Sequence, residues 1–102
     1  MIARVWRGAT RSEDAPAYAD YLERTGMHAA RELSGSRGTL VLRRDLGERT
    51  EFVTILLWDS LDSIRPFAGD DPGCAVFFPE DDRYLVEREL KVAHYEVDER
   101  RD

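Results

Sequence analysis

Hydrophobic and polar positions alternate in several segments of this chain, and a period of two residues is typical of β-strands. The pattern is clearest from Ile2 to Thr10, from Thr39 to Arg44 and from Thr50 to Trp58. The last two segments are joined by Leu46 to Arg49, a short loop with a glycine, which predicts a hairpin. Glu89 to Val97 closes the chain as a fourth predicted strand.

Between the first two strands, apolar side chains recur at helical spacing. Ser12 or Asp14 can cap this helix, and Pro16 then falls in the first turn, where a missing N–H costs little. We expect Gly26 to end or break the helix, and Met27 to Leu33 to continue as a second short piece.

A second helical pattern follows the hairpin. It runs from Ser60 to Ala68, where Pro66 predicts a short or kinked helix. Pro79 to Leu85 predicts one or two further turns, and its acids Glu80, Asp81 and Asp82 are interpreted as favourable charge at a helix start. The order strand, helix, strand, strand, helix, strand predicts an α+β, ferredoxin-like βαββαβ fold with a four-stranded antiparallel sheet.

The predicted strand from Thr50 to Trp58 is largely apolar on both faces, so both faces of the sheet need cover. Two helices can cover one face. We expect the other face, with Trp6, Thr54, Leu56 and Trp58, to stay uncovered in a monomer. Such a patch usually marks an association surface, which predicts a homodimer with sheet packed on sheet.

Composition narrows the class of protein. The chain has 102 residues, a formal net charge of -6 and one cysteine, Cys74. We expect one domain over residues 1–97 and a charged tail, residues 98–102, that frays. The acidic balance disfavours nucleic acid, and the lack of a membrane-spanning or signal-peptide run predicts a cytoplasmic protein without membrane contact. We expect no disulfide, no metal and no bound cofactor, because zinc-ligand spacing and glycine-rich nucleotide motifs are absent from the sequence.

Three stretches of sequence carry a resemblance to a known family. They are Phe52 to Asp71, which includes Trp-Asp-Ser-Leu-Asp and Phe-Ala-Gly, then Pro79-Glu80-Asp81, and the terminal His94-Tyr95-Glu96-Val97. Together they resemble small bacterial proteins of the antibiotic biosynthesis monooxygenase superfamily, over nearly the whole chain. The resemblance implies a dimeric α/β barrel in which two ferredoxin-like sheets enclose the site. It implies less about activity, because the same barrel hosts oxygenases, haem-degrading enzymes, isomerases and proteins with no known chemistry.

Two residues are candidates for catalysis. His94 is one, because a neutral imidazole is the usual general base near pH 7. Arg4 is the other, because it shares strand parity with Trp6 and its cation would stabilise an enolate or superoxide. The alternatives are a histidine that is hydrogen-bonded within the fold and an arginine paired with a carboxylate at an interface.

Aromatic side chains are numerous enough to line a pocket for an aromatic ligand, although core packing explains each of them equally well. The candidates for ligand binding are Trp6, Trp58, Phe67, Phe77 and Tyr84. The function we predict is oxidation of a small aromatic or polyketide-type molecule with O2 and no bound cofactor. The alternatives are a non-catalytic binding or structural barrel protein, and a haem-handling protein with His94 as the iron ligand.

Overall fold

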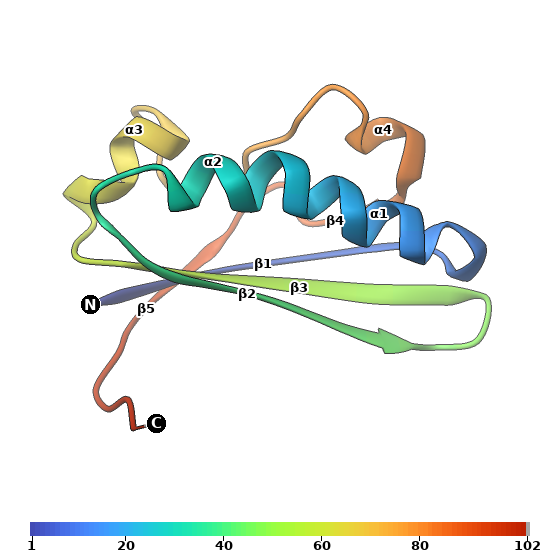
Figure 1. Ribbon diagram of the computed structural model, residues 1–102, viewed down its shortest axis with the longest axis horizontal. Coiled ribbons are helices and arrows are strands. Elements are labelled where there is room, and N and C mark those ends of the chain that lie inside the picture. Colours follow the sequence, from blue (N-terminus) through green and yellow to red (C-terminus); the bar gives the residue numbers. More distant parts are fainter. Residues whose placement is uncertain (102) are drawn as a thin grey trace.

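The sheet of this protein carries its helices on one face only (Figure 1). The structure is a computed structural model that describes residues 1–101, and these form a five-stranded antiparallel sheet. The order is β2-β3-β1, and both β4 and β5 pair with the outer edge of β1. The strands are β1 (Ile2–Arg11), β2 (Ser36–Asp45), β3 (Arg49–Trp58), β4 (Leu85–Arg88) and β5 (Ala93–Glu96).

The helical layer has one long rod and several short turns. The rod begins with the 3-10 turn η1 (Ser12–Asp14) and continues through α1 (Ala15–Leu22), the π-helical segment η2 (Glu23–Met27) and α2 (His28–Arg31). The expected break at Gly26 is therefore wrong. Gly26 lies buried inside the π-helical segment, which lets the chain stay helical through the glycine.

The remaining turns cover the two ends of the sheet. They are η3 (Asp62–Ile64), α3 (Arg65–Ala68) and α4 (Asp81–Tyr84). Pro66 sits in the first turn of α3, which confirms the expected short helix. Within residues 1–101, no helix is long and apolar enough to cross a membrane.

The predicted last strand, Glu89 to Val97, is split into β4 and β5, and β4 begins earlier, at Leu85. Of the intervening residues, Glu89 still donates its N–H to Arg7 O of β1 at 3.0 Å, whereas Leu90 and Val92 pair with a neighbouring loop. The Val92 N–H donates to Gly73 O at 2.9 Å, and the Ala75 N–H donates to Leu90 O at 2.9 Å. These bonds draw the segment away from the sheet, so the predicted fourth strand becomes two short ones.

The two faces of the sheet are the reverse of our expectation. Trp6, Thr54, Leu56 and Trp58 lie under the helices, and each is at most 9% exposed. Both faces of the sheet are apolar in sequence. The face under the helices carries the two indoles and Phe52, whose burial contributes the most free energy because their apolar surfaces are the largest. The opposite face is the open face, with residues of β1, β3, β2 and β5: Ala3, Val5, Val53, Ile55, Leu57, Leu40, Leu42, Ala93 and Tyr95.

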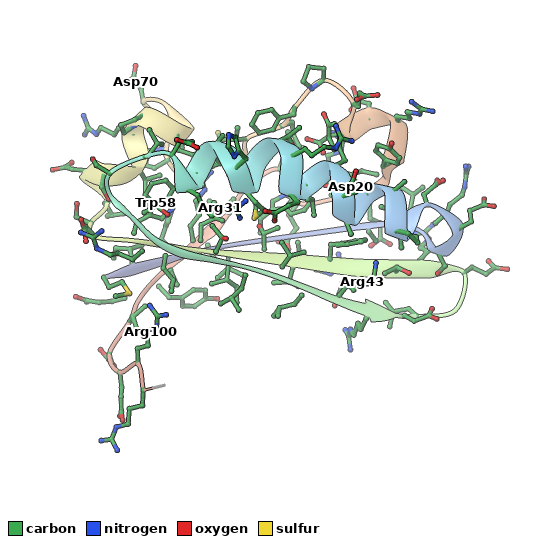
Figure 2. All side chains as sticks on the ribbon, viewed as in Figure 1. Asp20, Arg31, Arg43, Trp58, Asp70 and Arg100 are labelled. Carbon is green, nitrogen blue, oxygen red and sulfur yellow. The ribbon has the colours of Figure 1, made fainter. Side chains whose placement is uncertain are left out.

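The last residues that the structure describes lie on the open side of the sheet, away from the helices (Figure 1). Residues 98–101 have no regular secondary structure. Figure 2 shows Arg100 on this segment, and its Nη1 lies 3.5 Å from Arg37 O. The last residue of the expected tail, Asp102, lies outside the described residues.

We predict that Gly8→Ala destabilises the fold by about 1–3 kcal/mol, because it overpacks the core. An added Cβ would lie 2.4 Å from Trp6 Cη2. The indole can move away only by giving up the hydrogen bond that its Nε1 donates to Glu89 O at 2.8 Å. Urea denaturation measures the change.

Gly26→Ala is the matched control, since its Cβ would lie an ordinary 3.6 Å from Phe78. This variant should be as stable as wild type or slightly more stable. Equal stability of the two variants would contradict the prediction.

Candidate functional site

A cavity of about 50 Å³ lies between the sheet and the helical layer. It is on the helical side, whereas the resemblance implied a site between the sheets of two copies. Its walls come from β1, β3, α1, the π-helical segment, α3, α4 and the loop before α4. The lining residues are Arg4, Trp6, Tyr18, Leu22, Thr25, Gly26, Met27, Thr54, Leu56, Phe67, Val76, Phe77, Phe78, Asp81 and Val92. The lining is mostly apolar and aromatic, as small-molecule sites usually are.

Arg4 is the cation of this cavity. Its side chain comes from β1 and is only 3% exposed. Nη1 donates to Pro72 O, and Nη2 donates to Cys74 O at 2.7 Å. The guanidinium also lies 5.8 Å from the ring centroid of Phe67. Burial lowers the pKa of Arg4, but a guanidinium stays charged in proteins.

Within residues 1–101, Arg4 forms no ion pair with a carboxylate. A buried charge without a counter-charge is costly, and such charges are usually matched by a partner or a ligand. Arg4 is therefore the strongest sign of a functional site.

His94 lies beside Arg4. It is on β5 opposite Arg4 of β1, and its Nε2 is 3.1 Å from Arg4 Nη1. Because a guanidinium only donates, Nε2 is the acceptor and Nδ1 carries the proton. Burial, and then the charge of Arg4, lower the pKa of His94 below its usual value. His94 is thus a neutral base held against a cation, although it does not itself line the cavity.

Asp81 is a second charged residue in the lining, and sequence reasoning missed it. Its side chain is 5% exposed and accepts hydrogen bonds from the Phe78 N–H at 2.7 Å and from the Tyr18 hydroxyl at 3.2 Å. Burial raises the pKa of its carboxyl. In the sequence Asp81 is one of three consecutive acids, so nothing in the pattern separates it from its exposed neighbours.

The aromatic candidates divide into two groups. Trp6, Phe67 and Phe77 line the cavity. Trp58 and Tyr84 do not, and belong to the packing around it: Trp58 stacks on Phe67 at 5.7 Å between ring centroids, and Tyr84 packs on the tyrosines of α1. Figure 2 shows Trp58 between the sheet and the helices, and its Nε1 has no hydrogen-bond partner in residues 1–101.

Other reactive groups near the cavity offer no second site. The Cys74 thiol donates to Asp71 Oδ2 at 3.2 Å, and this carboxylate raises the pKa of the thiol, which opposes a nucleophilic role. Over residues 1–101, no group of three or more His, Cys, Asp or Glu side chains is placed to hold a metal ion.

We predict that the pKa of His94 lies below 6.5 in an NMR titration, with His28→Asn used to identify the signal. A histidine with a lowered folded pKa binds its proton more readily in the unfolded chain, so its contribution to stability falls as the pH drops below about 6.5. Wild type should therefore lose more stability between about pH 7.5 and about pH 5.5 than His94→Gln does. A His94 pKa at or above 6.5 would show that the contact with Arg4 does not form.

Comparisons with known proteins identify the fold. No family model matches the sequence, and no curated protein sequence matches it. Among solved structures, the chain is similar to a "putative antibiotic biosynthesis monooxygenase" from Bacillus cereus, with a TM-score of 0.67 at 12% sequence identity, over 99% of this chain and 96% of that chain. Identity this low says nothing about the reaction. This chain therefore has an α+β, ferredoxin-like fold, as the sequence predicted, and shares it with the Bacillus cereus protein.

Proposed function

We propose that this protein is a cofactor-independent oxygenase that oxidises a small phenolic or polyketide-type aromatic molecule with O2. The observation that carries the proposal is Arg4, a buried cation without a carboxylate partner in the wall of an aromatic cavity. A ligand that is anionic, or becomes so in the reaction, supplies the missing negative charge. The Bacillus cereus structure of the same fold carries a monooxygenase name, which adds an analogy of fold and no evidence from the reacting groups.

The contact between Arg4 and His94 suggests how a phenol is activated. When the phenol oxygen pairs with Arg4 Nη1, it displaces His94 Nε2 from the guanidinium. The freed nitrogen then accepts the phenolic proton, and the phenolate remains against the cation. His94 is well suited to this step because its lowered pKa keeps the ring neutral at pH 7.

The electrons for the reaction come from the substrate. The phenolate gives one electron to O2, and the resulting radical and superoxide combine to a carbon-bound peroxide. His94 returns the proton to the distal peroxide oxygen, and loss of water leaves a quinone. One phenol and one O2 thus become one quinone and one water. The haem alternative gains no support from this geometry, because His94 does not line the cavity and a volume of about 50 Å³ is far too small for a porphyrin.

We predict O2 consumption, measured with an oxygen electrode, when metal-free protein is mixed with a panel of phenols that runs from single-ring dihydroxybenzenes to naphthol- and anthrone-type molecules. Arg4→Gln and His94→Ala should each reduce the rate by about a hundredfold, the range for loss of an anion-stabilising donor or a general base. Arg24→Gln is the control, because Arg24 is exposed on the helical rod and pairs with Asp20. Circular dichroism checks that each variant is folded.

Two results would refute the oxygenase. One is no uptake above background with any of these phenols. The other is an unchanged rate in folded Arg4→Gln. Either result would favour the non-catalytic binding protein.

We also propose that two copies associate through the open face. Leu40 and Leu42 on β2 are 48% and 46% exposed, and Tyr95 on β5 is 59% exposed. One end of this face is polar, where Arg7 and Arg44 contact Glu51 at 2.5 and 2.8 Å. An apolar surface with a charged rim is typical of a protein interface, and a second copy of the same face is self-complementary.

We predict that wild type sediments as a dimer at micromolar concentration and that the double variant Leu40→Glu, Leu42→Glu sediments as a folded monomer. The introduced carboxylates cannot be desolvated at an apolar interface without partners. Leu61→Glu is the matched control, because Leu61 is also 48% exposed but lies outside the open face. This variant should sediment as a dimer, as wild type does. A monomeric wild type would contradict this association.

A further inference from the structure

The cavity that holds Arg4 also holds the opposite charge. Arg4 and Asp81 are 3% and 5% exposed, and both line the same space. Among the described residues 1–101, neither belongs to a salt bridge, with each other or with another side chain. Removing two charges from water without pairing them is unfavourable by several kcal/mol for each ion. The hydrogen bonds of the two side chains hold neighbouring segments in place but supply no opposite charge, and a ligand with complementary groups would supply it to both residues.

Asp81 is held in place for such a role. The Phe78 N–H fixes Oδ2 at 2.7 Å, and the Tyr18 hydroxyl fixes Oδ1 at 3.2 Å. The nearest cation, Arg88, is turned to the neighbouring Asp82 at 2.7 Å. A carboxylate oxygen can accept more than one hydrogen bond, so Asp81 keeps acceptor capacity for a ligand.

The cavity between the two charged residues is lined by aromatic rings. Trp6 and Phe77 meet edge to face at 6.2 Å between centroids, and Phe67 lies next to Arg4. The indole N–H of Trp6 is already bonded to Glu89 O. This part of the wall therefore offers flat apolar surface and no free donor, which suits an aromatic ring.

We propose that the cavity recognises a single-ring diphenol, with the oxygen that becomes the phenolate paired to Arg4 and the second hydroxyl donating to Asp81. The volume of about 50 Å³ is below the roughly 150 Å³ that accommodates benzene, so one ring must displace part of the cavity wall, and a polycyclic ligand would have to displace much more of it. A neutral donor suits Asp81 better than an ammonium group, because two hydrogen bonds and the nearby charge of Arg88 already offset part of its negative charge.

This inference rests on the cavity being the substrate site, as proposed above, and it names the class of substrate. Binding tests it without turnover, so the two proposals can fail separately. The probes are 4-hydroxybenzoate, benzoate and 4-(aminomethyl)benzoate, in which the carboxylate stands in for the phenolate against Arg4, and their binding is measured by isothermal titration calorimetry. Wild type should bind 4-hydroxybenzoate about tenfold more tightly than benzoate, which is the value of one hydrogen bond to a buried charge.

Asp81→Asn tests the assigned residue. It keeps the shape of the side chain and an acceptor for the Phe78 N–H but removes the charge. It should reduce the preference for 4-hydroxybenzoate over benzoate to about twofold or less, with benzoate affinity nearly unchanged. Asp82→Asn is the matched control, because Asp82 is the adjacent exposed acid, and it should keep the tenfold preference.

Several outcomes would overturn the inference. These are equal affinity of wild type for the hydroxylated and plain probes, no binding of either, an unchanged preference in folded Asp81→Asn, or tighter binding of 4-(aminomethyl)benzoate. If Asp81→Asn fails to fold, the three probes on wild type still decide. Oxygen uptake without the hydroxyl preference would leave the oxygenase proposal intact and remove this one, and the preference without uptake would do the reverse.

Discussion

The buried guanidinium of Arg4 is the interaction on which the site depends. Residues 69–80 contain no helix and no strand, so little regular hydrogen bonding holds this loop over the sheet. Arg4 supplies the missing bonds, because it donates to the carbonyls of Pro72 and Cys74 and to the ring of His94. One side chain from the first strand thus joins the cavity roof and the last strand. The same charge that organises these segments is left without a negative partner.

The choice of sheet face separates two properties of the molecule. The indole-rich face meets the helices and forms the cavity, and the face with smaller aliphatic residues is open. Ligand binding and association, as proposed, therefore use opposite sides of one sheet. An altered open face can change the oligomeric state without touching Arg4 or Asp81. This arrangement differs from a site enclosed between two sheets, in which every change at the interface would also change the site.

The fold and the site carry different kinds of information about function. Similarity to the Bacillus cereus structure extends over almost the whole of both chains, yet identity is 12%, so it describes the backbone and not the reacting groups. The chemistry follows from a small number of polar side chains in an apolar space. In such a space the dielectric constant is low, so the electrostatic interactions of each polar side chain are stronger than they would be in water, because little solvent screens them. That is why two residues, Arg4 and Asp81, say more about ligand class than the surrounding aromatic wall.

The sequence by itself determined the order of the strands and helices, the hairpin, the ferredoxin-like topology and the presence of two apolar sheet faces. These follow from local periodicity and turn residues, which act over a few positions. It also singled out Arg4, His94, Trp6, Phe67 and Phe77, although their roles remain proposals. Tertiary structure alone decided which face the helices cover, that the last strand is split, and that Asp81 is buried beside Tyr18. Each depends on contacts between distant segments, and burial of one acid among three adjacent acids leaves no mark in a one-dimensional pattern.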